Sequence, residues 1–366
     1  MKNLRFCTAK AVFVSIFLFG LSLVSFGQND STSAVHVGFI YPLSTNGKHA
    51  ASYTNRFSLH AIAGLSKSET GVAIAGAANV IKQDASGLQM AGAVNLISHD
   101  AKGIQLAGAA NIIGNNASGI QMAGFSNIVK NEAKGGQIAG FMNLAGSSQS
   151  VQMAGFANIT RNDAKGLQLS GFLNKGKNVN AQVAGFANIA TNVKGIQFAG
   201  LINIADTSDY PIAIFNFIKS GEKSVAVTLD ETMTTIASFR SGGRVLYGIA
   251  GVGYNFKDDK RDLYAVEAGL GAHIKLVNDF RLNLEAVSQT LSNFKKGNYS
   301  KSSLRIIPAY KIGNKLEIFA GPTINYVSYD RDKDYDFVKK YIWKNNSSKD
   351  FQGVYFGFNT GIQLLL

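Results

Sequence analysis

Apolar residues occupy every second position along several segments of the chain after residue 224. Between residues 264 and 276, the even-numbered residues are apolar or tyrosine, whereas the odd-numbered ones include Glu267, His273 and Lys275. A period of two is the pattern of a β-strand with two different faces. Eight such segments follow one another up to the end of the chain. Those of about 14 residues are long enough to cross a bilayer as tilted strands. The region 211–366 therefore predicts the strands of an antiparallel, transmembrane-type β-barrel.

The linkers between these segments alternate between short and long. Short linkers lie at 242–244, 277–279 and 314–315, and longer ones lie at 257–262, 292–301 and 330–353. Outer-membrane barrels have short turns on the periplasmic side and long loops on the outer side. The alternation therefore predicts that the C-terminus lies at the periplasmic rim.

Alternation also assigns the charged residues of these strands to one face. We expect seven of them to point into the lumen as structural charges: Glu267, Lys275, Arg281, Glu285, Arg305, Lys311 and Glu317. The opposite face carries Leu270, Ile274, Leu282 and Leu284, which we expect to contact outer-membrane lipid. Opposite charges on one inner face can pair, so a small barrel of this kind should conduct ions weakly.

A second pattern, with a period of 14 to 16 residues, fills the region 71–210. Nine copies of a unit of the form GxQxAGxxN follow one another, although Ala73 replaces the glutamine in the first copy. Each copy contributes one asparagine, which we expect to form a structural ladder: Asn79, Asn95, Asn111, Asn127, Asn143, Asn158, Asn174, Asn188 and Asn203. Within a copy, Ile104 and Leu106 alternate with Gln105, which is strand periodicity. The period is too short for helical repeats.

Two architectures fit these repeats. In a β-solenoid, each copy is one coil, and equivalent asparagine and glutamine side chains stack and satisfy one another's amides. Alternatively, each copy is one strand of a large antiparallel barrel of twenty strands, a pore or transporter whose lumen the amides line. Consecutive turns look alike, and only 7 of the 140 residues in 71–210 are Phe or Tyr, whereas lipid-facing strands usually carry aromatic girdles. Both observations favour the solenoid.

Two further candidate strands precede the repeats, at 36–43 and 56–65. Added to the eight C-terminal segments, they give ten strands, and bacterial barrels have an even number. We therefore expect 28–70 to hold N-terminal barrel strands, 71–210 to be the repeat block inserted at the periplasmic rim, and 211–366 to complete the barrel. The fold class is all-β.

The first 27 residues have the pattern of a secretory signal peptide. Lys2, Arg5 and Lys10 precede an apolar run from residue 11 to 24, and small residues follow at 25 and 27. The only cysteine, Cys7, lies within this segment, so the remaining chain would have no thiol for a disulfide or a zinc-thiolate site. Without this segment the net charge falls from +13 to about +10, because three basic residues are removed. The bases are scattered among acids, which is not typical of a nucleic-acid interface.

The unit GxQxAGxxNI, the segment 57–66 (FSLHAIAGLS) and the segment 230–249 (DETMTTIASFRSGGRVLYGI) resemble the bacterial surface-repeat outer-membrane proteins. The resemblance extends over nearly the whole chain after the signal peptide. It implies a signal peptide, tandem repeats, a C-terminal barrel-like region and a place at the cell surface. It implies no enzymatic activity.

No residue pattern points to catalysis. The histidines are far apart in the sequence, and the chain lacks HExxH, GxSxG and P-loop motifs. His273 as the base of a Ser–His lipase is the best enzymatic alternative, but its place among strand charges favours a structural role. Asp330, Asp332, Asp334 and Asp336 alternate in the longest linker without the glycine and glutamate of a calcium loop. We expect a structural or surface-interaction protein of the outer membrane without cofactors, whose partners are lipid and an unknown surface ligand or envelope protein, not nucleic acid.

Overall fold

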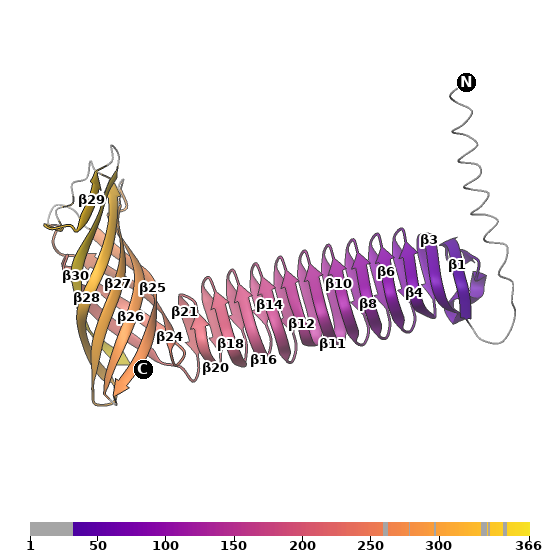
Figure 1. The fold of residues 1–366 in the computed structure, drawn as a ribbon, viewed down its shortest axis with the longest axis horizontal. Coiled ribbons are helices and arrows are strands. Elements are labelled where there is room, and N and C mark those ends of the chain that lie inside the picture. The colour runs from indigo at the N-terminus through magenta and orange to yellow at the C-terminus, as the bar shows by residue number, and fades with distance from the viewer. Residues whose placement is uncertain are drawn as a thin grey trace, which may run out of the picture.

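The computed structural model describes residues 32–258, 263–277, 279–295, 298–330, 335, 337–346 and 350–366. The expected signal peptide and most of the aspartates of the longest linker lie outside the described residues. Two β modules make up the described chain: a long solenoid formed by residues 32–218 and a barrel formed by residues 223–365 (Figure 1). In the described part of the chain, no helix has both the length and the apolar character needed to cross a membrane.

The solenoid contains twenty-one strands and one short 3-10 helix. The helix η1 spans Gly47–Ser52, and the strands are β1 (Thr32–Ile40), β2 (Leu43–Ser44), β3 (Thr54–Ser66), β4 (Ser68–Ala75), β5 (Ala78–Ile81), β6 (Ala85–Ala91), β7 (Val94–Ile97), β8 (Ala101–Ala107), β9 (Ala110–Ile113), β10 (Ala117–Ala123), β11 (Ser126–Ala139), β12 (Met142–Ala154), β13 (Ala157–Thr160), β14 (Ala164–Ser170), β15 (Leu173–Lys175), β16 (Asn178–Ala184), β17 (Ala187–Ile189), β18 (Asn192–Ala199), β19 (Ile202–Ala205), β20 (Thr207–Ile212) and β21 (Phe215–Ile218).

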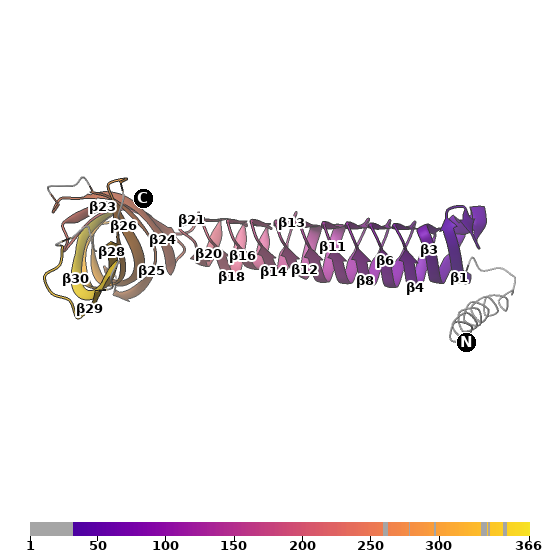
Figure 2. The same cartoon turned by 90° about the horizontal axis from the view of Figure 1, so that it is seen from above.

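Each repeat forms one coil of the solenoid, with one longer and one shorter strand. Equivalent residues of successive coils pair in parallel, so that Gln105 lies beside Gln89 and Gln121, and Asn111 lies beside Asn95 and Asn127. Seen from above, the longer and shorter strands form the two sides of a flattened tube (Figure 2). The solenoid is therefore the correct architecture for the repeats, and the single twenty-strand barrel is not.

The second glycine of each repeat lies at the narrow corner between the two strands of a coil. A Cβ at Gly108 would lie 2.0 Å from the carbonyl oxygen of Gly92, and one at Gly124 would lie 2.1 Å from that of Gly108. Contacts this short exclude any side chain, so the stacking distance at this corner requires glycine. We call this edge of the solenoid the glycine corner, and the opposite edge, formed by the turns between coils, the polar edge.

The structure corrects the expected role of residues 28–70. Strand β1 pairs in parallel with β3, and β3 pairs in parallel with β4 and β5, so both belong to the solenoid and not to the barrel. Strand β2 turns back against β1 and, with η1, covers the first coil at the N-terminal end. The alternating pattern predicted strands here correctly, but a solenoid coil and a barrel strand share that pattern, so it could not identify the partner.

The barrel has eight strands in its closed ring, not the ten expected from the sequence. Strands β22 and β30 pair with each other and close the ring, while β29 pairs only with β30. The strands are β22 (Lys223–Asp230), β23 (Thr234–Gly242), β24 (Leu246–Asn255), β25 (Leu263–Val277), β26 (Phe280–Ser292), β27 (Tyr299–Ile312), β28 (Leu316–Asp330), β29 (Trp343–Asn346) and β30 (Asp350–Leu365). Every pairing is antiparallel, as the alternation predicted.

The solenoid is seated directly on the barrel wall. A Cβ at Gly248 of β24 would lie 2.2 Å from the carbonyl oxygens of Ala213 and Ile214, and one at Gly243 would lie 2.4 Å from that of Ser208. The backbone amide of Asn216 also donates a hydrogen bond to Ser241 Oγ at 3.0 Å. In Figure 1 the solenoid extends sideways from the half of the barrel that contains the C-terminus, and its longer strands run nearly along the barrel strands.

Candidate functional site

Polar and charged side chains gather in the interior of both modules, and these interiors are the candidate sites. In the solenoid, the asparagine of every repeat is almost fully buried, and each donates through Nδ2 to Oδ1 of the asparagine in the next coil at 2.8–3.0 Å. The ladder runs through all nine expected residues and adds a tenth, Asn216. Asn216 was missed because the glutamine and the glycine of the repeat unit are absent before it.

Each asparagine is held in place by backbone contacts as well. Asn127 Nδ2 donates to the carbonyl oxygen of Ile138 at 2.8 Å in addition to Asn143 Oδ1 at 2.9 Å. These two bonds use both hydrogens of the amide, and the side-chain oxygen accepts from Asn111. The amide atoms of Asn127 are therefore already bonded inside the tube.

The glutamines form a second ladder that runs in the opposite direction. Gln105 Nε2 donates to Gln89 Oε1 of the preceding coil at 2.9 Å, and Gln168 donates to Gln152 in the same sense. The row is interrupted between Gln121 and Gln137, whose facing amide atoms have no partner in the structure. The donating NH₂ groups of the asparagines therefore point toward the barrel, and those of the glutamines point away from it.

A separate polar cluster fills the N-terminal end of the solenoid. The ring of His36 packs edge-on against that of His60 at 4.4 Å, and its Nδ1 accepts a hydrogen bond from Asn55 Nδ2 at 3.3 Å. The Glu69 carboxylate accepts from Asn55 at 3.0 Å and from Ser58 Oγ at 2.8 Å. All five side chains are buried. Sequence reasoning missed this cluster because the histidines lie 24 residues apart in the chain.

Burial decides the protonation of these groups. It lowers the pKa of His36 to about 4, with a smaller contribution from the neighbouring His60, and it also lowers the pKa of His60. Burial raises the pKa of the Glu69 carboxyl, although the hydrogen bonds from Asn55 and Ser58 oppose this shift. Both histidines are thus neutral at pH 7. In the described residues, no group of three or more His, Cys, Asp or Glu side chains is arranged to hold a metal ion.

The barrel interior contains a network of paired charges. Arg305 contacts Glu267 through both terminal nitrogens, at 2.5 and 3.3 Å, and also lies 3.5 Å from Glu285. Glu285 in turn contacts Arg240 Nη1 at 3.0 Å and accepts a hydrogen bond from the Tyr247 hydroxyl at 2.8 Å. Each of these side chains is almost completely buried, and each charge has a partner of opposite sign.

Two further groups of ion pairs extend this network toward both ends of the lumen. At the short-turn end, Arg281 contacts Glu317 at 2.8 Å and Glu222 at 2.7 Å. Nearer the long loops, Lys301 pairs with Asp230. Of the seven expected lumen charges, the structure brings together Glu267, Arg281, Glu285, Arg305 and Glu317.

Lys275 and Lys311 are the two that it does not include. Lys275 is exposed and Lys311 half-buried, and neither forms an ion pair with the described residues. Both lie close to the short turns, so they are on the inward side of their strands but beyond the enclosed part of the lumen. Sequence reasoning also missed Glu222, Asp230, Arg240 and Lys301. Lys301 could have been found, since it shares the face of Arg305 on β27.

His273 occupies a structural position within this network. Its ring stacks on that of Tyr247 at 4.2 Å, its Nδ1 lies 2.9 Å from Asn283 Oδ1, and its Nε2 lies 3.6 Å from Glu222. Its hydrogen-bond partners among the described residues include no serine. The arrangement that a Ser–His hydrolase requires is therefore not formed around His273.

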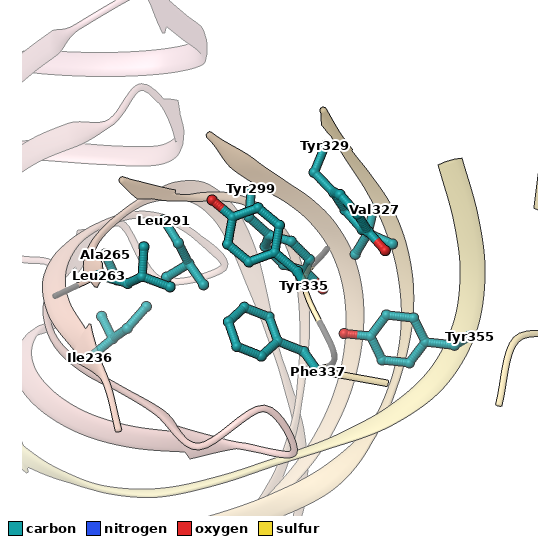
Figure 3. Close-up of a cluster of buried hydrophobic side chains, with 10 residues drawn as sticks. All are labelled: Ile236, Leu263, Ala265, Leu291, Tyr299, Val327, Tyr329, Tyr335, Phe337 and Tyr355. Atoms are coloured by element: carbon teal, nitrogen blue, oxygen red, sulfur yellow. The ribbon is translucent and has the colours of Figure 1, made fainter. Parts of the chain in front are cut away.

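Aromatic side chains fill the lumen at the end nearer the long loops. Tyr299, Tyr329 and Tyr355 project inward from β27, β28 and β30 (Figure 3). Tyr335 and Phe337, from the linker between β28 and β29, pack among them. The carbonyl oxygen of Phe337 accepts a hydrogen bond from Lys257 Nζ at 2.8 Å, which ties this linker to the barrel. The interior of an eight-stranded barrel is narrow enough for its own side chains to fill it. Charges and aromatic rings thus occupy the lumen along its length.

Comparison with known proteins does not assign the chain to a group. No protein-family model, no curated protein and no solved structure matches it.

Proposed function

We propose that this chain is a structural or interaction protein of a Gram-negative outer membrane, without catalytic activity, in which the barrel spans the membrane and anchors the solenoid. The observation that carries the proposal is the separation of charge across the barrel wall. Apart from the first and last residues of the strands, the outward positions of β22–β28 and β30 carry no charged side chain. The charged residues within these strands face inward.

The dimensions of the apolar band support a membrane span. Tyr326 pairs with Ser302 of β27, and Phe280 pairs with Tyr310 of the same strand, so two outward aromatic positions lie eight residues apart along β27. That separation is about 27 Å along the strand, or about 20 Å along the membrane normal for a strand tilted by 35–45°, which falls within the apolar band of about 25 Å between the aromatic girdles of outer-membrane barrels. Leu270, Leu284 and Leu304 are exposed between these levels.

The filled lumen argues against a pore or transporter. The pore alternative required the repeats to line a wide channel, but their amides lie inside the solenoid and bond to one another. Paired charges and the side chains of Tyr335 and Phe337 fill the barrel. The role supported best is therefore that of an anchor that holds the solenoid in a fixed position at the membrane.

Cysteine labelling tests the span directly, because Cys7 is the only cysteine of the chain. In a Cys7→Ser background, Leu284→Cys should be labelled poorly by a water-soluble maleimide when the protein is in lipid vesicles, and readily in denaturant. The folded barrel should also show heat-modifiable mobility in SDS gels, and planar-bilayer recordings should show little conductance. Recovery of the protein in the soluble periplasmic fraction, or free labelling at position 284 in vesicles, would refute the proposal.

A further inference from the structure

We infer that the solenoid is itself embedded in the membrane: its glycine-corner half lies among the acyl chains of the periplasmic leaflet, and its polar edge faces the periplasm. This inference rests on the proposed membrane span of the barrel. It gives the solenoid a binding partner of defined chemistry, one leaflet of a glycerophospholipid bilayer.

The first argument is that the solenoid is apolar outside and polar inside. Its interior holds the asparagine and glutamine ladders, whereas the outward positions of the longer strands hold Ile, Leu, Met and Phe. Two rows of these are exposed by 37–52%; their members include Ile104, Ile120, Val151 and Ile196 in one row, and Met90, Met122, Ile138, Met153 and Phe198 in the other. A soluble solenoid would have the reverse arrangement, since exposed apolar surface is favourable only against lipid or another apolar surface.

The glycine corner continues this apolar surface around the edge of the tube. Phe125, Phe141, Phe156, Phe172 and Phe186 follow the corner glycines of five successive coils. Their rings stack face to face at 4.8–4.9 Å with interplanar angles of 2–7°, and each is 37–55% exposed. An apolar groove lined by Met90, Leu106 and Met122 runs beside the same corner. The shorter strands add exposed Leu96, Ile204 and Phe217, so both sides and the corner are apolar apart from Lys175.

The charged residues of the repeats lie toward the opposite edge, except Lys175, which is exposed on the outward face of β15 between Ile159 and Ile189. In the coil 103–118 no residue is charged, and in the coil 119–134 the charges begin at Lys130, after the shorter strand has ended its apolar run. From Lys102 at the start of β8 to Gly108 at the corner is six residues, or about 20 Å. Half of a hydrocarbon core is about 15 Å thick. Half of a bilayer that includes its headgroups is about 20–22 Å thick, so the uncharged part of such a coil matches one leaflet down to the headgroup level.

The junction with the barrel sets the solenoid at the matching height. The polar edge of the last coil, at Ser208 and Asp209, lies against Gly243 in a short turn at the barrel rim. Ala213, which directly follows β20, lies against Gly248, and Gly248 pairs with Leu270 in the exposed apolar band. The glycine corner therefore lies within the apolar band when the polar edge is level with the rim. The lipid-facing surfaces of the two modules are continuous.

A row of lysines marks the boundary between the two halves of the solenoid. Lys102, Lys134, Lys165 and Lys194 each precede a glycine at the start of a longer strand, and all four are exposed. At the inferred depth their ammonium groups would meet the phosphates of the lipid headgroups, with the stems along the apolar surface. A second copy of the chain would cover one side of the tube, whereas acyl chains cover both sides and the corner. Lipid is thus the occupant that fits the whole surface.

Depth-dependent fluorescence quenching tests the inference on the full chain. In the Cys7→Ser background, an environment-sensitive fluorophore is attached at Phe141→Cys on the corner, at Asn131→Cys on the polar edge of the preceding coil, or at Leu284→Cys on the barrel. Each protein is reconstituted in vesicles of phosphatidylethanolamine and phosphatidylglycerol that carry a nitroxide either deep in the acyl chain or near the headgroup. Heat-modifiable mobility confirms that each variant is folded.

We expect the label at 141 to lose most of its emission with the deep nitroxide, as the label at 284 does, while the label at 131 responds to an aqueous quencher only. If 284 is quenched by lipid and 141 is open to the aqueous quencher, the inference is wrong and the membrane span stands. If 284 itself is not quenched, the proposed function fails. If 141 is shielded from both quenchers and shows self-quenching between labelled copies, the apolar half binds a second copy, which also overturns the inference.

Discussion

Gly248 of the barrel and Ala213 of the solenoid approach so closely that a Cβ on Gly248 would lie 2.2 Å from the carbonyl oxygen of Ala213. Gly248 points outward from the barrel wall, yet it is buried because the last coil covers it. The contact fixes the height and the direction at which the solenoid leaves the barrel. A residue with a side chain at this position would prevent the contact, so the glycine allows the last coil to pack against the barrel wall.

We predict that Gly248→Val displaces the last coil from the barrel wall without unfolding either module. The added atoms overlap the backbone of residues 213–214, and overpacking of this kind costs roughly 1–3 kcal/mol. Hydrogen exchange of the amides in β20 and β21 should become faster, while the amides of β6–β10 keep their protection. Gly136→Ala is the matched control, because a Cβ at Gly136 meets no atom within 4 Å. Equal exchange in both variants would contradict this account of the junction.

The barrel charges give a second prediction. Glu267→Gln removes the carboxylate that contacts both terminal nitrogens of Arg305 and leaves a buried guanidinium with less compensation. Breaking one side of a buried pair typically costs 3–5 kcal/mol, so the urea midpoint of the heat-modifiable form should fall clearly. Lys275→Gln should have almost no effect, since Lys275 is exposed. The double variant Glu267→Leu/Arg305→Met should recover much of the loss, because it leaves no unpaired charge.

The asparagine ladder gives a third. Asn127→Leu should lower the unfolding free energy by roughly 1–3 kcal/mol, because Asn111 and Asn143 on either side each lose a buried partner. Asn203 should be equally sensitive: it lies near the end of the repeats but accepts from Asn188 and donates to Asn216. Asn79→Leu should cost less, since only Asn95 continues the ladder from it. Thermal unfolding followed by circular dichroism compares the three, and a uniform effect would argue against cooperation along the ladder.

Acid should loosen the N-terminal end of the solenoid. The pKa of His36 is lowered to about 4 by burial and by His60. The imidazole therefore takes up a proton more readily in the unfolded chain, where its pKa is 6.5. The stability that neutral His36 contributes is complete above pH 6.5 and is lost as the pH falls toward 4, by roughly 1–3 kcal/mol. Glu69 acts in the opposite sense, since its raised pKa favours the folded state as the pH falls toward and below 4.5.

Amide exchange of β1 and β3, corrected for the intrinsic dependence on pH, should therefore show weaker protection at pH 5 than at pH 7. His36→Gln preserves a polar side chain that does not titrate, and it should remove most of the change between these two pH values. The amides of β14–β18, which are remote from the cluster, serve as an internal reference. An unaltered pH profile in the variant would show that another group controls this end.

Alternation along the chain was sufficient to predict most of the architecture. It predicted the antiparallel strands, and together with the repeat period it favoured a solenoid for the Gly/Asn units. It did not distinguish the coil formed by β1 and β3 from barrel strands, because the partner of a strand is fixed by contacts far along the sequence. Alternation also assigns a side to each residue but not its height, so Lys275 and Lys311 were placed with the enclosed charges although they lie near the rim.

The opposite directions of the two amide ladders have a consequence for the length of the module. A single row of side-chain amides pointing one way would add its dipoles coil by coil and accumulate partial charge at both ends, as in a helix. Here the asparagine row points toward the barrel and the glutamine row points away from it, so their dipoles largely cancel. Adding or removing whole coils therefore creates no growing electric field along the axis. The reach of the solenoid can change by duplication or loss of 16-residue units, while the barrel and the N-terminal end remain as they are.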